Sequence, residues 1–349
     1  MSIRLASEED RDVWNGFVDK HPYATPYHDF SWRELLEETY GHKCFYLLAE
    51  REGRVSGVLP MILVKPPFLG GTLVSLPFCD IGGALALDDD VKSSLVLEAV
   101  DVAKGLNVHK VELREDTPPE YLQKHALTVG TRTHKVRMIL TLPETSELLW
   151  SSFKAKLRSQ VRKAEKNGLR FSWGERVEDT DAFYSVFSTN MKELGSPVHA
   201  KSLFQALYRK YKNARFGLVY FENTPVGAGV ILFTGSRVSI PWASTLLEYN
   251  RLSPNMLMYW NFLKFSCESG FETFDFGRSS PGEGTYRFKE QWGARPQPLC
   301  WNMVHLAGKP DESSSVDSGK KKIVIRAWKA LPLQAANLLG PILRKYISL

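Results

Sequence analysis

Residues that could do chemistry are concentrated between Glu272 and Ala294. An expected strand ends here in Phe274-Asp275-Phe276-Gly277-Arg278, followed by the glycine-rich loop Pro281-Gly282-Glu283-Gly284-Thr285. A short helix with Arg287 and Lys289 is expected next. Glycines let a backbone approach a ligand closely, and cations beside a helix start attract negative charge. The pattern predicts a ligand-binding turn, and a glycine-rich surface turn is the structural alternative.

Two familiar nucleotide sites do not fit this stretch. Asp275-Phe276-Gly277 matches the metal-binding triplet of protein kinases, but the chain lacks their catalytic-loop sequence and strand lysine. A phosphate-binding loop is excluded because no Gly-Lys-Ser/Thr follows at the required spacing. The sequence therefore argues against a kinase and against a P-loop enzyme.

A second candidate region is strongly basic. Between residues 154 and 170 a single acidic residue, Glu165, accompanies Lys154, Lys156, Arg158, Arg162, Lys163, Lys166 and Arg170. Residues four apart share one face of a helix, so Arg158, Arg162 and Lys166 lie together. This face suits a phosphate-rich ligand such as tRNA or a nucleotide-linked sugar, and a solvated helix surface is the alternative.

Taken together, these segments resemble the FemABX-type transferases. The resemblance is carried by Phe274–Arg278, Phe288-Lys289 and Trp292-Gly293, and by the basic stretch from Leu157 to Gly168. The helix start Ser253-Pro254-Asn255, the segment Tyr27-His28-Asp29-Phe30-Ser31-Trp32 and the tail are most similar to the FemAB-related proteins of exopolysaccharide/PEP-CTERM loci. The similarity runs from about residue 3 to residue 305, with the tail added.

This resemblance implies transfer of an acyl group to an amine, with aminoacyl-tRNA as the donor in the peptidoglycan-bridge enzymes. Such a reaction passes through an oxyanion, which requires a cation or fixed hydrogen-bond donors. By resemblance Lys289 supplies the cation and Tyr286 is a candidate proton donor to the leaving group. A solvated lysine and a packing tyrosine are the alternatives. The resemblance adds Arg278, Gly282, Gly284 and Phe288 as donor-binding residues.

A second part of the expected donor site is the segment Asn250, Ser253 and Asn255, before a helix of the second domain. In GNAT enzymes this helix start holds the donor's pyrophosphate. Ser253 and Asn255 stand where glycines of the Arg-x-x-Gly-x-Gly/Ala pattern are expected, which puts coenzyme A in doubt. The acceptor end of a tRNA or a modified acyl-CoA loop remains, as does an ordinary Ser-Pro-Asn helix cap.

In the first domain, Tyr27, His28 and Trp32 resemble the acceptor side of the family. The bridge enzymes carry a basic residue shortly after the tryptophan for the acceptor's diphosphate. Arg33 is the nearest candidate here, and its register differs. A packed or capping histidine is the alternative for His28.

Length and composition set the class of protein. A chain of 349 residues favours two domains. We find no apolar run of about 18 residues and no apolar signal region at the N-terminus, so a cytoplasmic protein is expected. Cys44, Cys79, Cys267 and Cys300 are far apart and show no metal spacing, which predicts reduced thiols and no metal site.

The expected elements repeat in order. Strands at 44–51 and 54–64, joined by Glu52-Gly53, form a hairpin that is followed by strands and a helix at 91–106. Helices near 147–167, 181–194 and 254–269 and strands at 216–221, 226–233 and 237–243 give the same order again. This order predicts an α/β fold with two copies of one unit. The resemblance implies that they are GNAT-like domains, at 1–140 (acceptor side) and 141–307 (donor side), with mixed sheets, flanking helices and a C-terminal helical tail.

The basic character of the chain belongs to its tail. Residues 320–349 hold seven basic side chains and no acidic one, leaving 38 basic and 39 acidic groups elsewhere. After a linker (308–319), apolar residues recur with helical spacing, interrupted by Pro332 and Pro341. Two interpretations remain for 320–349, a helix docked on the body or an amphipathic anchor on the inner face of the cell membrane.

The sequence thus predicts an N-acyltransferase or aminoacyltransferase acting on an amine of a cell-envelope or exopolysaccharide precursor. The alternatives are an aminoacyl-tRNA-dependent ligase of peptidoglycan bridges and a catalytically silent GNAT-like scaffold. No tightly bound cofactor is expected. Acyl-CoA or aminoacyl-tRNA is the co-substrate, a nucleotide- or lipid-linked sugar is the acceptor, and we expect a monomer.

Overall fold

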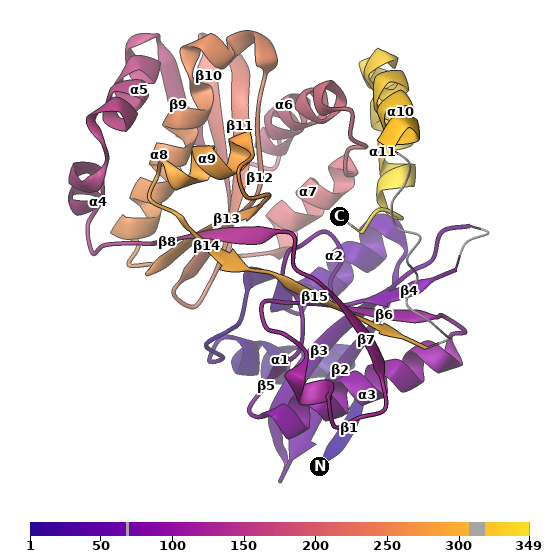
Figure 1. Ribbon diagram of the computed structural model, residues 1–349. Helices are drawn as coiled ribbons and strands as arrows, with labels where there is room; N and C mark the ends of the chain where they lie inside the picture. The colour runs from indigo at the N-terminus through magenta and orange to yellow at the C-terminus, as the bar shows by residue number, and fades with distance from the viewer. Residues whose placement is uncertain (68–69, 307–317, 349) are drawn as a thin grey trace. The chain divides into compact units, whose positions relative to one another are not determined.

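The computed structural model describes residues 1–67, 70–306 and 318–348 (Figure 1). The chain divides into two compact units. Unit 1 contains Met1–Arg137 with residues 297–306 and 345–348, and unit 2 contains Met138–Pro296 with residues 318–344. Most of the predicted linker, residues 308–317, lies outside the described residues, and its last two residues begin a helix.

Unit 1 is built on a mixed sheet with the strand order β1-β2-β3-β4-β6-β15-β7, and β5 pairs with β3. Its strands are β1 (Ser2–Leu5), β2 (Lys43–Arg51), β3 (Arg54–Val64), β4 (Thr72–Val74), β5 (Leu85–Ala86), β6 (Lys110–Glu115), β7 (Thr128–Arg132) and β15 (Cys300–His305). Its helices are α1 (Arg11–Val18), α2 (Ser31–Tyr40) and α3 (Asp89–Gly105), with short 3-10 turns at Glu8–Asp10, Pro26–His28 and Glu120–Leu122.

Local sequence explains the main elements of unit 1. Glu52 and Gly53 both have positive φ (54° and 73°), as the tight turn of a hairpin requires, and the predicted β2–β3 hairpin is confirmed. The Asp88 side chain caps α3 by accepting a hydrogen bond from the Val91 amide at 2.9 Å. The apolar face of α3, including Leu95, packs on the sheet to form the core.

Unit 2 contains a seven-stranded sheet with the order β14-β8-β13-β12-β11-β10-β9. Its strands are β8 (Val136–Thr141), β9 (Leu169–Trp173), β10 (Ala214–Phe221), β11 (Thr224–Thr234), β12 (Arg237–Thr245), β13 (Thr273–Ser279) and β14 (Arg295–Pro298). Its helices are α4 (Ser146–Ser152), α5 (Ala155–Lys166), α6 (Asp179–Leu194), α7 (Lys201–Lys210), α8 (Pro254–Glu268), α9 (Gly284–Glu290), α10 (Ser318–Ala330) and α11 (Leu333–Arg344), with a 3-10 turn at Leu247–Leu252.

The position of α8 against the sheet depends on two glycines. A Cβ atom at Gly217 would lie 2.3 Å from Cε1 of Phe262, and one at Gly229 would lie 2.9 Å from Cε2 of the same ring. Any larger residue at either position would push α8 away from β10 and β11. These two glycines therefore determine how closely α8, the helix between the parallel strands β12 and β13, packs on the sheet.

The two sheets have corresponding strand orders, as the predicted repeat requires. In each unit an antiparallel hairpin (β2–β3, β10–β11) is followed by a third strand, a helix and a strand that pairs parallel to the third. The strand on the other side of β6 and of β13 comes from outside this run. In unit 2 this strand is β8, which precedes the run, whereas in unit 1 it is β15, which follows β14 in the chain.

This arrangement corrects the predicted domain limits in two places. Residues 300–305 were assigned to the second domain, but β15 pairs with β6 and β7 in unit 1, because its backbone completes that sheet. The tail is not a separate piece, since α10 and α11 pack on α6 within unit 2. Its last described residues belong to unit 1, where the Ser348 carbonyl accepts a hydrogen bond from the Phe78 amide at 2.8 Å.

Candidate functional site

The site of unit 2 is formed where the parallel strands β12 and β13 diverge. Their ladder joins Arg237–Ser239 to Thr273–Asp275, and no further ladder pair joins the two strands, both of which are described throughout. β12 stays paired with β11 to its end, and the Leu246 amide extends this pairing by donating to the Val226 carbonyl at 2.9 Å. The second halves of β12 and β13 are therefore not paired with each other in a ladder.

The predicted donor segment lies directly after β12. Ser253 adopts a left-handed conformation (φ 67°) as the N-cap of α8, and Pro254 occupies the first turn. The Ser253 amide donates to the Asn250 carbonyl at 3.0 Å, and the Asn250 side chain accepts from the Thr245 hydroxyl at 3.0 Å. Asn255 follows, half-buried.

These contacts use up several donors that a pyrophosphate would need. Pro254 has no amide hydrogen, and the Met256 amide donates to the Ser253 carbonyl at 3.0 Å. Phosphate binding at a helix start depends on free amide donors. The segment as it stands offers a weaker phosphate cradle than a glycine-rich turn would.

Lys289 is buried, with 8% of its surface exposed, so the alternative of a solvated helix lysine is wrong. Its Nζ atom donates to the carbonyls of Gly277 and Arg278, at 3.0 and 2.8 Å. The side chain therefore joins α9 to the end of β13. The Lys289 ammonium group thus lies at the end of β13, close to the glycine-rich loop. There it contacts two backbone carbonyls of the protein itself.

The other predicted residues of this region surround that contact. Tyr286 is half-buried, one turn before Lys289 on α9, and Arg278 is half-buried at the end of β13. Gly282 has φ 81°, which favours glycine, whereas a Cβ at Gly284 would meet nothing within 4 Å. The loop therefore requires glycine at Gly282 for its backbone conformation.

Aromatic packing holds α9 in place. The Phe288 ring lies 5.0 Å from that of Tyr259, which stacks on Phe276 at 5.6 Å. Trp292 packs on Phe153 at 5.4 Å. Burial raises the pKa of Tyr259, so its hydroxyl stays protonated. Phe288 thus packs against Tyr259 in this structure. The sequence had singled it out as a donor-binding residue and did not indicate this packing.

The basic helix α5 divides into engaged and solvated cations. Arg158 donates to the Ser151 carbonyl at 3.1 Å, at the C-terminal end of α4, where a cation is favoured. Arg162 is exposed and lies over the Trp150 ring at 5.5 Å, and Lys166 is exposed. Two of the three predicted phosphate-binding residues are thus available to a ligand, and Arg158 has a structural contact.

The structure brings the end of α5 to the predicted donor segment. The Asn167 side chain, at the C-cap of α5, donates to the Leu252 carbonyl at 3.5 Å. Lys166 precedes Asn167 in the chain. Sequence spacing alone could not predict this contact, because 85 residues separate the two partners.

In unit 1, the three predicted acceptor residues are buried. The Trp32 Nε1 atom donates to the Pro26 carbonyl at 2.9 Å, and the Tyr27 ring lies 5.3 Å from that of Trp32. Arg33 donates to the Ala6 carbonyl at 2.8 Å and pairs with Glu37. These contacts hold α2 in place and leave neither Tyr27 nor Trp32 among the residues that line the cavity of this unit.

His28 is a packed histidine. Its Nδ1 atom accepts a hydrogen bond from the Thr25 amide at 3.1 Å, and its Nε2 atom lies 3.0 Å from the Gly83 carbonyl. The ring is therefore neutral, with the proton on Nε2. Burial lowers its pKa to about 4. Such a group is a poor general base near neutral pH, so the packed-histidine alternative fits the structure.

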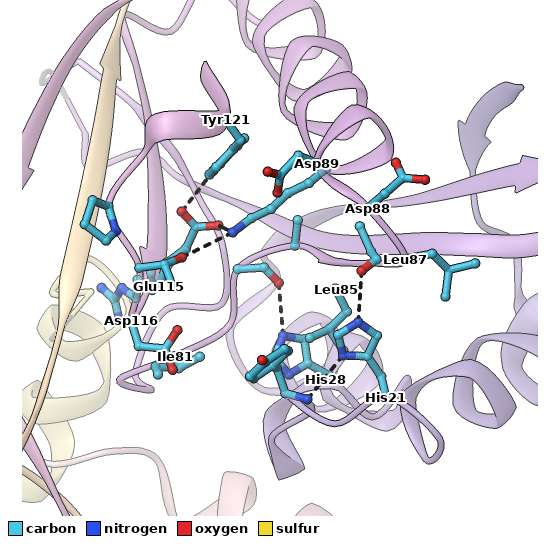
Figure 2. Close-up of a pocket in the computed structure, with 18 of the residues that line it drawn as sticks. His21, His28, Ile81, Leu85, Leu87, Asp88, Asp89, Glu115, Asp116 and Tyr121 are labelled. Atoms are coloured by element: carbon cyan, nitrogen blue, oxygen red, sulfur yellow. Dashed lines mark hydrogen bonds and ion pairs between the residues drawn. The ribbon is translucent and has the colours of Figure 1, made fainter. Parts of the chain in front are cut away.

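A cavity of about 410 Å³ in unit 1 was not predicted (Figure 2). His28 forms part of its wall, beside His21, Glu115 and Tyr121. Glu115 is buried, accepts from the Tyr121 hydroxyl at 2.9 Å, and pairs with Lys92 at 3.0 Å. The lining carboxylates are Asp88, Asp89, Glu115, Asp116 and Glu120.

The charge of this cavity is negative. Its two cations are already paired, Lys92 with Glu115 and Arg114 with Glu112. Burial lowers the pKa of His21, which favours a neutral ring. A diphosphate would be repelled, whereas an ammonium group would be attracted. The sequence signal was the acidic run of residues 88–90 at the start of α3 together with Asp116 after β6, but nothing in their spacing showed that they line one cavity.

Comparison with known proteins agrees with this fold. Residues 151–290 match the family described as the acetyltransferase (GNAT) domain. A crystal structure of FemX is similar with a TM-score of 0.71 at 16% identity, over 88% of this chain and 98% of that chain. No curated protein matches the sequence.

Two further structures share the arrangement at low identity. The C-terminal domain of a putative lysylphosphatidylglycerol synthetase from Agrobacterium fabrum has a TM-score of 0.58 at 12% identity, over 85% of this chain and 91% of that chain. A tandem GNAT protein from the clavulanic acid biosynthesis pathway has a TM-score of 0.54 at 11% identity, over 89% and 100%.

These matches confirm the predicted fold class of two GNAT-like α/β domains with flanking helices and a C-terminal helical region. The GNAT domain of unit 2 also confirms the prediction of an acyltransferase at the level of its class. The likeness to solved structures, at these identities, is a likeness of fold.

Proposed function

We propose that this chain transfers an acyl or aminoacyl group to an amine of a cell-envelope or exopolysaccharide precursor. The observation that carries the proposal is the divergence of β12 and β13 within the GNAT domain of unit 2. An extended acyl donor enters between these strands and presents its carbonyl near the end of β13. The amine then attacks that carbonyl.

The chemical step needs three changes. The amine nitrogen forms a bond to the carbonyl carbon, the resulting oxyanion collapses, and the bond to the leaving oxygen or sulfur breaks. The acceptor amine first loses a proton to water and attacks as the neutral amine. Tyr286 then donates a proton to the leaving group and is reprotonated from the positively charged nitrogen of the tetrahedral intermediate. Lys289, whose Nζ lies beside the Gly277 and Arg278 carbonyls at the end of β13, stabilises the oxyanion.

For the donor, we propose an aminoacyl ester of tRNA rather than coenzyme A, although acyl-CoA is the usual co-substrate of the GNAT fold. The bonded amides around Ser253 and the missing amide of Pro254 support this choice. The exposed cations Arg162 and Lys166 support it further, since they suit the phosphates of a nucleic acid. The names FemX and lysylphosphatidylglycerol synthetase are in keeping with aminoacyl transfer.

For the acceptor, the cavity of unit 1 supports a cationic amine. Its five carboxylates outnumber its two cations and would attract an ammonium group of the acceptor. A ligase of peptidoglycan bridges is the second candidate, favoured by the likeness to FemX. The acceptor is then a nucleotide- or lipid-linked sugar that carries such an amine.

A donor competition tests the proposal. Full-length protein is mixed with lysyl- or alanyl-tRNA or with acetyl-CoA, each with a set of amine acceptors, and products are identified by mass spectrometry. We expect an amide product from at least one aminoacyl-tRNA. Transfer from acetyl-CoA alone would overturn the choice of donor. The absence of any product, together with no rise of the melting temperature by any donor, would favour a silent scaffold.

A further inference from the structure

The tail of the chain has an inner face that docks on unit 2. Ala336 and Trp328 are buried, and Gly340 lies against Val198, where a Cβ would approach the Val198 Cγ1 atom to 2.8 Å. Arg344 Nε lies 3.0 Å from Nε2 of His199. At Gly195 a Cβ would lie 2.6 Å from Cγ2 of Ile325. These contacts fix α10 and α11 to α6 and to the segment after it. Figure 1 shows the two helices beside α6.

The same helices carry an apolar face that nothing in the described part of the chain covers. Leu338 and Ile342 are 71% and 55% exposed, and Leu339 and Leu343 lie beside them at 42% and 46%. Ile323 and Val324 on α10 are 67% and 65% exposed. Together with Ile347, these are seven of the fifteen large apolar side chains exposed among the described residues, so the exposure is concentrated in the tail.

Helical geometry separates the two faces of α11. At about 100° per residue, positions 336, 340 and 344 fall within one sector of about 80°, which is the docked face. Positions 338, 339, 342 and 343 fall in a sector of about 140° on the other side. The exposed stripe is thus a second interaction surface rather than an imperfect part of the first.

Charge narrows the class of partner. Residues 318–348 contain no acidic residue, and they contain Lys320, Lys321, Lys322, Arg326, Lys329, Arg344 and Lys345. A second copy of the chain would bring like charges together. An apolar stripe in a segment whose charged residues are all basic matches a surface with anionic headgroups over an apolar interior.

The helix can lie on such a surface but cannot cross it. Twelve residues of α11 extend over about 18 Å, whereas the hydrocarbon core of a bilayer is about 30 Å thick. Within the described residues, no helix combines the length and the apolarity that crossing would require.

We propose that the exposed faces of α10 and α11 bind the interface of an anionic lipid bilayer, with α11 in the plane of the membrane and its inner face still docked on unit 2. This surface is independent of the proposed reaction. It would bring the acyltransferase to acceptors that reside at the membrane.

Vesicle co-sedimentation of the full chain tests the proposal. Vesicles of phosphatidylcholine alone are compared with vesicles that contain about 30% phosphatidylglycerol, at about 0.05 and 0.5 M salt. We expect binding to the anionic vesicles, at least ten-fold weaker at high salt and at least ten-fold weaker on neutral vesicles. Equal binding to both kinds of vesicle, or binding to neither, would overturn it.

Variants distinguish binding by this apolar face from nonspecific binding of the protein to vesicles. Leu338→Glu with Ile342→Glu should reduce binding at least ten-fold without changing the melting temperature, because both side chains are solvent-exposed. The matched control is Leu5→Glu with Val13→Glu, two exposed positions of unit 1, which should bind as the wild type does. Retained binding by the tail variant would overturn the proposal. So would light scattering that shows a wild-type dimer abolished by the tail variant, since a second copy would then cover the stripe.

Discussion

Unit 1 and unit 2 repeat one order of strands, yet they differ at the place where the central parallel strands separate. In unit 2, β12 and β13 share three ladder pairs, and the chain directly after β12 stays bonded to β11 on the other side. In unit 1, β4 and β6 also share three pairs, but the chain after β4 stays bonded to β6. The Ser75 amide donates to the Glu112 carbonyl at 2.8 Å, and the Gly82 amide donates to the Arg114 carbonyl at 3.0 Å.

The end of the chain closes this place in unit 1 further. The Ser348 carbonyl accepts from the Phe78 amide at 2.8 Å and from the Arg114 guanidinium at 2.7 Å. In unit 1 the backbone at this place is thus bonded within the chain itself. The comparison teaches that the two copies of the fold differ where their central parallel strands separate, and that unit 1 carries an acidic cavity at a different place.

The largest expected effect is a loss of stability in unit 1, where the chain after β4 stays bonded to β6. Arg114 is fully buried and pairs with Glu112 at 3.0 Å, so Arg114→Met leaves a buried carboxylate without its cation. Removal of one partner of a buried pair costs about 3–5 kcal/mol. We expect urea unfolding to show this loss in the free energy of unfolding, with donor affinity unchanged under native conditions. An exposed counterpart, Arg54→Met, should have almost no effect, and weakened donor binding by Arg114→Met would contradict the division of roles.

The second prediction concerns pH and again unit 1. Burial lowers the pKa of His28 from 6.5 to about 4, so the unfolded chain binds its proton at a higher pH than the folded chain does. Stability from this group is therefore complete above pH 6.5 and is lost as pH falls toward 4, by up to about 3 kcal/mol.

Urea unfolding between pH 7 and pH 4 measures this loss. His28→Gln should lower stability at pH 7 and flatten its pH dependence, whereas the exposed His109→Gln should keep the wild-type slope. His28→Gln with an unchanged slope would show that His28 is not the buried neutral group that the contacts indicate.

Much of this comparison could be predicted from the sequence, because periodicity and turns are local. The β2–β3 hairpin followed from Glu52-Gly53, and the repeated order of helix, hairpin, strand and helix predicted two similar units. The exchange of β15 into the sheet of unit 1 could not be predicted, since strand pairing depends on partners far apart in the chain. The same holds for the contact between Asn167 and Leu252 and for the closure by Ser348.

The site was predicted in part. Lys289 and the loop at Gly282 lie beside the end of β13, as the motif indicated, but the two carbonyls that Lys289 contacts belong to no motif. His28, Tyr27 and Trp32 were singled out by residue type, whereas their burial is a property of packing that residue type does not show. The acidic cavity was missed because its wall combines residues from 21 to 121.

The third prediction tests the role of Lys289 in unit 2. Lys289→Ala should lower turnover roughly 100-fold or more, the cost expected for a lost oxyanion donor. It should also lower the free energy of unfolding by about 1–3 kcal/mol, since the buried carbonyls of Gly277 and Arg278 lose their donor. The control Lys264→Ala, on the exposed side of α8, should change neither quantity. A loss of stability with full turnover would leave Lys289 only its structural contact.

The smallest expected effect concerns the exposed cations of α5. It tests whether unit 2 also binds a nucleic acid. If Arg162 and Lys166 contact phosphates of tRNA, each contact releases counterions and contributes roughly 0.7–0.9 to the slope of log affinity against log salt. Replacing both with Gln should therefore reduce that slope by roughly 1.5, measured by fluorescence anisotropy with labelled deacylated tRNA. Arg158 is left in place, because its bond to the Ser151 carbonyl supports the end of α4.

A control pair of substitutions distinguishes the effect of direct phosphate contacts from the effect of the protein's total charge. Arg209→Gln with Lys210→Gln removes the same two charges from exposed positions at the end of α7 in unit 2. This control should leave the slope almost unchanged, because only phosphates in contact release their counterions. If both pairs reduced the slope equally, the protein would attract tRNA through its overall charge, and α5 would be a solvated surface. A reduction confined to Arg162 and Lys166 would instead place the donor's phosphates beside Asn167 and the start of α8, on the one unit whose central strands separate.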